Sequence, residues 1–224
     1  YLQDQYLGIL AGIAKAASIT PLGFIDHCAA CAYNTSLKQS FTTLDIGLNQ
    51  TIVSSIEVEN REFRVTSASQ TSLGMIGIAD NWISCIADEF IRNFRFDPLY
   101  SAATEQQMFD EVISWIESGE LPADLKISVR TADAERSITL IPDLLQKYLV
   151  AKLDETNLDK TTAVVLSHRF NRIPLIKDIL EDRVSRCYVA DQKEVAAAAL
   201  AIAADFEAGK LERLRGCSAL SRNE

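Results

Sequence analysis

The feature that most constrains the fold is a run of three segments in which side chains alternate with a period of two. These segments are 41–46, 51–59 and 62–68, which are rich in Thr, Val and Ile, and a short turn at 59–62 joins the last two. Such a run predicts three consecutive antiparallel strands. The later segment 161–167 is apolar throughout, as is typical of a strand buried on both faces.

Helical spacing surrounds these strands and predicts an α/β protein with a mixed sheet flanked by helices. At 224 residues the chain corresponds to about one and a half typical domains, so we expect one core interrupted by a smaller unit. We assign 1–94 and 160–209 to the core, 95–159 to an inserted α+β subdomain, and 210–224 to a frayed tail. The expected helices are 2–17, 26–36, 73–93, 103–118, 142–154, one opened by Pro174, and 192–208, and the shorter strands are 22–25, 125–130, 136–140 and 187–189.

Composition and charge exclude several classes of protein. The chain is 48% hydrophobic and 24% charged, and its net charge of -9 argues against broad binding to nucleic acid or to anionic lipid. Its longest apolar run, 195–204, is too short to span a membrane. Five cysteines, an odd number, lie in apolar segments, which indicates a reducing and therefore cytoplasmic location. The chain opens at Tyr1 without a signal-peptide pattern, and we expect it to be a piece of a longer protein.

A C-x-x-C pair, Cys28 and Cys31, directly follows His27 and leaves two interpretations open. The pair could serve redox or metal chemistry. However, the redox motif belongs at a strand-to-helix turn, and a structural zinc site needs a second pair of ligands that His168 alone cannot supply. Because alanines surround both cysteines, we expect them to pack inside a helix.

The segment 44–51 is the strongest candidate for chemistry. It is a strand that ends in Asp45, followed by Gly47 and polar residues before the next strand. The inward N–H groups of such a turn can cradle a phosphate, and the aspartate can hold Mg²⁺ through water. The alternative is a plain hairpin turn, with Gly47 for a positive φ and Asn49 for the bend.

A basic group follows the buried strand 161–167. His168 and Arg169 stand at its carboxyl end with Arg172 close behind, so they could meet a phosphate or an acidic partner. The alternative is a solvent-exposed strand end that needs no ligand.

The order of these elements resembles one lobe of the actin and heat-shock chaperone ATPase superfamily, from about residue 7 to residue 206. Segment 44–51 looks like its second phosphate motif, Asp-x-Gly-Gly-Gly-Thr-Thr, and 68–75 is similar to the chaperone segment Ala-Gly-Asp-Thr-His-Leu-Gly-Gly. Segment 164–174 looks like the adenosine motif Val-Gly-Gly-Ser-Thr-Arg-Ile-Pro, and 28–33 fits the helix Ala-Ala-Ala-Leu-Ala-Tyr.

The resemblance implies a ribonuclease H-like lobe that binds ATP and Mg²⁺ against a second, N-terminal lobe absent from this chain, with a protein client as a further partner. Phosphoryl transfer needs groups from both lobes, so we do not expect this chain alone to hydrolyse ATP. By resemblance, Asp45 would hold Mg²⁺ through water. The phosphate contacts would be Asp45, Gly47, Asn49, Gln50, Thr51 and Gly74, and the nucleoside contacts His168, Arg169 and Arg172.

The chain also departs from the superfamily at several glycines, which elsewhere allow close approach of the backbone to the nucleotide. Leu48 and Asn49 replace two glycines, Met75 replaces another, and His168-Arg169 replaces a glycine pair. The retained motif residues favour a chaperone-like nucleotide-binding protein. The altered glycines favour a degenerate actin-like scaffold that has lost ATP and serves protein–protein assembly. A sugar or acetate kinase of the superfamily is a third and weaker hypothesis.

Overall fold

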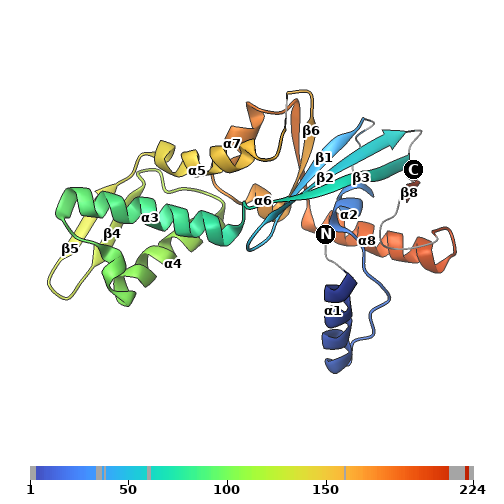
Figure 1. The fold of residues 1–224 in the computed structure, drawn as a ribbon, viewed down its shortest axis with the longest axis horizontal. Helices are drawn as coiled ribbons and strands as arrows, with labels where there is room; N and C mark the ends of the chain where they lie inside the picture. Colours follow the sequence, from blue (N-terminus) through green and yellow to red (C-terminus); the bar gives the residue numbers. More distant parts are fainter. Residues whose placement is uncertain are drawn as a thin grey trace.

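The computed structural model describes residues 4–33, 37, 39–59, 62–158, 160–211 and 220–221. Its centre is a six-stranded mixed sheet in the order β7-β6-β1-β2-β3-β8 (Figure 1). β1 pairs in parallel with β6, which pairs in parallel with β7, while β1–β2, β2–β3 and β3–β8 are antiparallel. The strands are β1 (Phe41–Ile46), β2 (Thr51–Glu59), β3 (Glu62–Thr71), β6 (Ala163–Ser167), β7 (Arg186–Ala190) and β8 (Leu220–Ser221).

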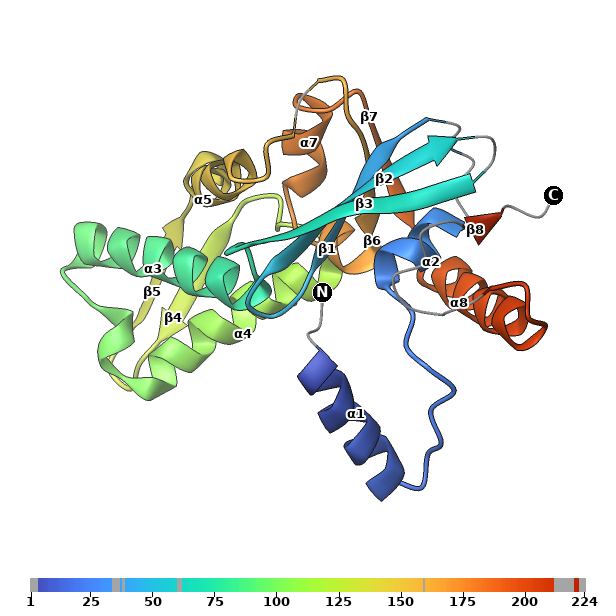
Figure 2. The ribbon, with the colours of Figure 1, turned by 45° about the vertical axis from the view of Figure 1, so that its right-hand side comes forward.

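Helices cover both faces of this sheet, and β6 shows why its sequence is apolar throughout. Val164 and Leu166 join one buried cluster, whereas Ala163 and Val165 join the cluster on the opposite face. The second face is covered by α2 (His27–Tyr33) and α8 (Gln192–Glu207), which lie together beneath the sheet (Figures 1 and 2). The first face meets α3 (Met75–Phe94), α6 (His168–Asn171) and α7 (Ile176–Glu181).

The inserted segment forms the opposite half of the molecule in Figure 1. Its core belongs to the same buried cluster as the first face of the sheet, because α3 runs from one to the other. Trp82 of α3 donates its indole N–H to the carbonyl of Leu145 at 3.1 Å and packs 6.3 Å from Trp115, centroid to centroid. The elements are η1 (Pro98–Tyr100), α4 (Ala102–Ser118), β4 (Lys126–Arg130), β5 (Glu135–Thr139) and α5 (Pro142–Asp154).

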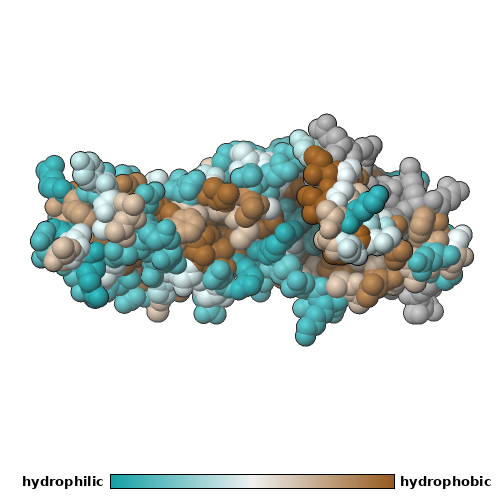
Figure 3. All heavy atoms as spheres, turned by 90° about the horizontal axis from the view of Figure 1, so that it is seen from below, coloured by the Kyte–Doolittle hydropathy of each residue, from teal (hydrophilic) through white to brown (hydrophobic). Residues whose placement is uncertain are grey.

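The first helix, α1 (Asp4–Ala16), confirms the predicted amphipathic helix but stands apart from the sheet (Figures 1 and 2). Several of its large apolar side chains are exposed, with Ile9 at 59% and Ile13 at 60%. Seen from below, the molecule carries separate apolar patches among polar surface (Figure 3). Within the described residues, no helix combines the length and the apolar character that crossing a membrane requires.

Most predicted elements are confirmed, and 41–46 and 142–154 have the predicted bounds. The strand expected at 22–25 is wrong. That segment is an irregular link between α1 and α2, with Leu22 71% exposed, so it has no neighbouring strand to pair with. The expected helix at 26–36 ends at Tyr33 among the described residues, and 34–36 lie outside them, as do residues 60 and 61 of the expected turn.

Three further differences lie after β6. The segment 210–224 was expected to be a frayed tail, but Leu220–Ser221 pairs with β3 and extends the sheet; 212–219 and 222–224 lie outside the described residues. The short helix α6 was not predicted, and Ile176 rather than Pro174 begins the following helix. Leu175, with φ of 68°, forms a left-handed cap between them.

Candidate functional site

The candidate site lies where the parallel strands β1 and β6 end. Leu44 of β1 is paired with Leu166 of β6, so Asp45 comes at the same level as the start of α6. One guanidinium nitrogen of Arg169 in α6 lies 2.9 Å from Asp45 Oδ1 and 3.1 Å from Oδ2. The carboxylate is largely buried, with its side chain 14% exposed, whereas the Arg169 side chain is 47% exposed. Asp45 therefore has a cationic partner on its solvent side.

His27 also approaches Asp45, at the oxygen that Arg169 contacts at 3.1 Å. Asp45 belongs to the odd-numbered residues of β1, which face α2, and His27 is the first residue of that helix. Its Nδ1 atom lies 3.4 Å from Asp45 Oδ2. Burial lowers the pKa of His27, and the positive charge of Arg169 lowers it further, although Asp45 acts to raise it. The lowered pKa favours the neutral form of the imidazole.

The two cysteines after His27 lie in α2, as predicted from their surroundings. Cys31 is buried, with its sulfur 3.5 Å from His27 Nδ1, and burial raises the pKa of its thiol to about 12. Burial likewise raises the pKa of Cys28. A thiol held protonated is a poor nucleophile and a poor metal ligand. Among the described residues, moreover, no group of three or more His, Cys, Asp or Glu residues could hold a metal ion.

A small cavity of about 40 Å³ separates α2 from the ends of β1 and β2. His27, Cys28, Thr43, Asp45, Ile52 and Ser54 line it. Ser54 Oγ is fully buried and has no hydrogen-bond partner among the described residues.

The turn after β1 is packed tightly against the start of α3. Gly47 N–H donates to Gln50 O at 2.7 Å and closes the turn. Met75 N–H donates to Gly47 O at 3.1 Å, and Ile76 N–H donates to Leu48 O at 2.9 Å. Two of the N–H groups that begin α3, which could otherwise bind an anion, are therefore used within the protein.

Gly74 is required by this close contact. A Cβ atom there would come 2.3 Å from the backbone carbon of Asn49 and 2.5 Å from Leu48 O. Thr51, another predicted phosphate contact, is fully buried, and its hydroxyl donates to Leu73 O at 2.7 Å. Gly74 and Thr51 thus both hold the turn against α3.

The structure brings most of the predicted site residues to one edge. Asp45, the turn 47–50 and Gly74 adjoin, and Arg169 reaches Asp45, while His168 is near enough to lower the pKa of His27 by charge. Asn49 and Gln50 are exposed on the turn. Arg172 makes a different contact. Its backbone lies close to Gly119, at the end of α4, where a Cβ atom on Gly119 would be 3.6 Å from Arg172 O.

No motif or spacing in the sequence links His27 with Asp45. The one relevant signal was the alternation of side chains along β1, which places Asp45 on the face of the sheet that α2 covers. The residue at which that helix begins could not be predicted exactly.

Comparison with known proteins adds no relative to this description. No protein-family model matches the chain, and the search of curated proteins found no match.

Proposed function

We propose that this chain is the C-terminal lobe of an actin-like, heat-shock-type protein and that its Asp45 edge faces Mg-ATP held between two lobes. The element order supports this proposal: three antiparallel strands, a helix, an insertion, and then two parallel strands added beside β1. In open α/β sheets ligands bind beyond the carboxyl ends of the parallel strands. The cytoplasmic location expected from the cysteines, the protein client and a ribonuclease H-like origin belong to the same proposal.

The observation that carries the proposal is the meeting of Asp45, the 47–50 turn and Arg169 at that edge. Among the described backbone groups, the N–H groups of Leu48 and Asn49 have no backbone partner and are available to a phosphate. Asp45 would hold Mg²⁺ through water once Arg169 moves from the carboxylate to a phosphate oxygen. Both groups would then exchange one charged partner for another.

The cost of that exchange is moderate. A hydrogen bond between charged groups contributes about 1.5–3 kcal/mol, and the half-exposed Arg169 places this pair at the lower end. Opening the pair would weaken Mg-ATP binding about ten-fold, an amount that new phosphate contacts can offset.

The second candidate function is a protein-assembly scaffold without nucleotide. It is favoured by the internal pairing of the edge: Asp45 with Arg169, Thr51 with Leu73 O, and the first N–H groups of α3 with the turn. In this case the Asp45–Arg169 pair is a permanent structural contact, and the surfaces of the lobe carry the function.

Calorimetric titration of Mg-ATP into the protein that contains this chain separates the two functions. The nucleotide proposal predicts a measurable heat of Mg-ATP binding. It also predicts that Asp45→Asn lowers the affinity for Mg-ATP at least about ten-fold. Asp88→Asn is the matched control, because Asp88 is an exposed carboxylate on α3, 14 residues beyond Gly74. No heat at millimolar Mg-ATP would overturn the nucleotide proposal and leave the scaffold.

A further inference from the structure

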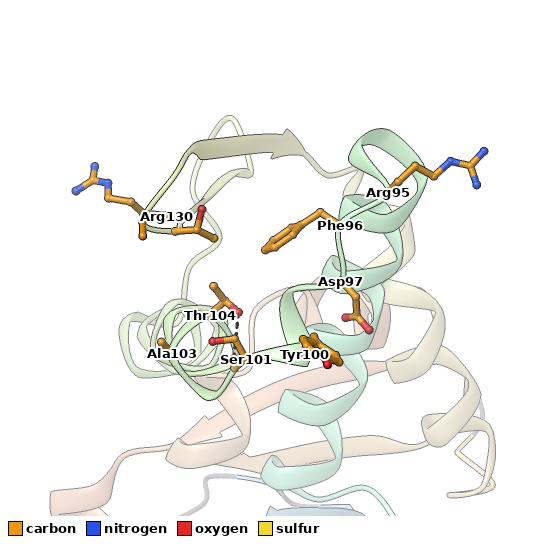
Figure 4. A pocket seen from close by; sticks show the side chains of 10 residues that line it. Arg95, Phe96, Asp97, Tyr100, Ser101, Ala103, Thr104 and Arg130 are labelled. Carbon is orange, nitrogen blue, oxygen red and sulfur yellow. Dashed lines mark hydrogen bonds between the residues drawn. The ribbon is translucent and has the colours of Figure 1, made fainter.

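A second cavity, of about 440 Å³, lies in the inserted half of the molecule (Figure 4). It is enclosed by the segment that follows α3, by η1 and the start of α4, and by the turn after β4. Its size falls within the range of sites that hold a ligand or a segment of peptide. None of the residues discussed for the Asp45 edge lines it.

The interior of this cavity suits an apolar group. The ring of Phe96 points into it in Figure 4. The guanidinium of Arg136 lies 4.6 Å from the centroid of that ring and holds it by a cation–π contact. The hydroxyl of Thr104, which also lines the cavity, donates to the carbonyls of Pro98 and Ser101, so its proton is already used. An apolar side chain can therefore enter the cavity without depriving the Thr104 hydroxyl of a hydrogen-bond acceptor.

The rim carries two cations on opposite sides of the cavity. In Figure 4 the side chains of Arg95 and Arg130 extend outward in opposite directions. Among the described residues, Arg95 has no ion-pair partner. Arg130 lies 3.3 Å from Glu135, but both side chains are at least half exposed, and such a pair contributes little. Asp97 is the carboxylate of the lining, and it caps η1 through the N–H of Leu99.

We propose that this cavity binds an acidic peptide segment of another protein, with one bulky apolar side chain against Phe96 and acidic residues on both sides that pair with Arg95 and Arg130. Because the two arginines lie on opposite sides of the cavity (Figure 4), a chain that crosses it can meet both. Tyr100, which is 94% exposed, also lines this cavity. Tyrosine and arginine are both enriched among the residues that contribute most to protein interfaces. The site stands whether or not the Asp45 edge binds nucleotide.

Fluorescence anisotropy with a labelled peptide that contains Glu-Glu-Phe-Glu-Glu tests this site. We expect saturable binding that weakens as salt is added and that falls at least about ten-fold in the double variant Arg95→Glu, Arg130→Glu. Tyr100→Ala, which changes an exposed side chain and leaves the core intact, is expected to weaken binding as well. Arg64→Glu is the matched control, because Arg64 is exposed on β3 in the other half of the molecule.

Three results would overturn the proposal. One is the absence of binding at millimolar peptide, and another is equal binding by the wild type and the double arginine variant. The third is a peptide with Ser in place of its Phe that binds as tightly as the original, since the cavity would then contribute nothing. Phenylacetate is the probe for a small-molecule site. If phenylacetate does not displace the peptide, the proposal is supported. If phenylacetate binds and the peptide does not, the proposal is contradicted.

Discussion

Replacement of Gly74 by alanine tests the contact between the 47–50 turn and α3 directly. The backbone at Gly74 is extended, with φ of -134°, so alanine adopts it without strain. The obstacle is space, because the new Cβ would lie 2.3–2.5 Å from three backbone atoms of Leu48 and Asn49. Backbone atoms cannot turn away as the end of a side chain can, so the turn and the helix must separate.

The size of the effect follows from what that separation disrupts. Overpacking costs about 1–3 kcal/mol. The hydrogen bonds from Met75 N–H to Gly47 O and from Ile76 N–H to Leu48 O are both at risk, at about 0.5–1.5 kcal/mol each. We therefore expect Gly74→Ala to lower the free energy of unfolding by about 2–6 kcal/mol, a large part of the stability of a typical domain.

Urea unfolding followed by tryptophan fluorescence measures this change. Both tryptophans, Trp82 and Trp115, are buried in the large cluster that contains α3, so their emission reports its loss. The midpoint should fall while the slope of free energy against urea stays constant.

Gly77→Ala is the matched control for Gly74→Ala, since it lies in the same helix and its Cβ would meet only the Tyr148 hydroxyl, at 2.7 Å. That hydroxyl ends a side chain that can shift, so we expect a loss below about 1 kcal/mol, offset in part by the higher helix propensity of alanine. A Gly74→Ala protein within about 0.5 kcal/mol of the wild type would refute the reasoning.

Three further predictions concern the rest of the chain. Because burial lowers the pKa of His27 in the folded state, the unfolded chain binds more protons below pH 6.5, and stability should fall as the pH drops below that value; His27→Gln should reduce this dependence in urea unfolding measured at several pH values. Cys31, with a pKa of about 12 and its side chain buried, should resist iodoacetamide at pH 8 in the folded protein and react once it is unfolded, as mass spectrometry can map. Ile13→Ser, at an exposed position of α1, should change stability by less than about 0.5 kcal/mol, whereas the fully buried Ile86→Ala should cost about 2–5 kcal/mol; equal costs would contradict the exposure of α1.

The elements of this fold could be predicted well where their pattern is local. The period of two placed β1, and Pro142 marked the start of α5. Prediction failed where a segment depends on what lies beside it. Leu22 and its neighbours have the composition of a strand, but the structure leaves them on a link with no strand to pair with.

The candidate site could be predicted in part for the same reason. Asp45, Gly47 and Gly74 were found from motifs that lie within single segments. Arg169 was also a candidate from its own segment, but its pairing with Asp45 was not predicted, because the two residues lie 124 positions apart in the chain. The approach of His27 to Asp45 from another helix was not predicted either. Thr51 was expected to contact phosphate, but in the structure its hydroxyl donates to Leu73 O. That contact, too, is a matter of tertiary structure.

The sequence by itself determined which residues form strands and, through their alternation, which face of the sheet each side chain takes, because these properties depend on neighbours along the chain. Only the tertiary structure decided that β6 lies beside β1, and with it that the carboxylate of Asp45 meets a guanidinium and an imidazole. Electrostatic pairing depends on distance through space, which the order of residues does not contain.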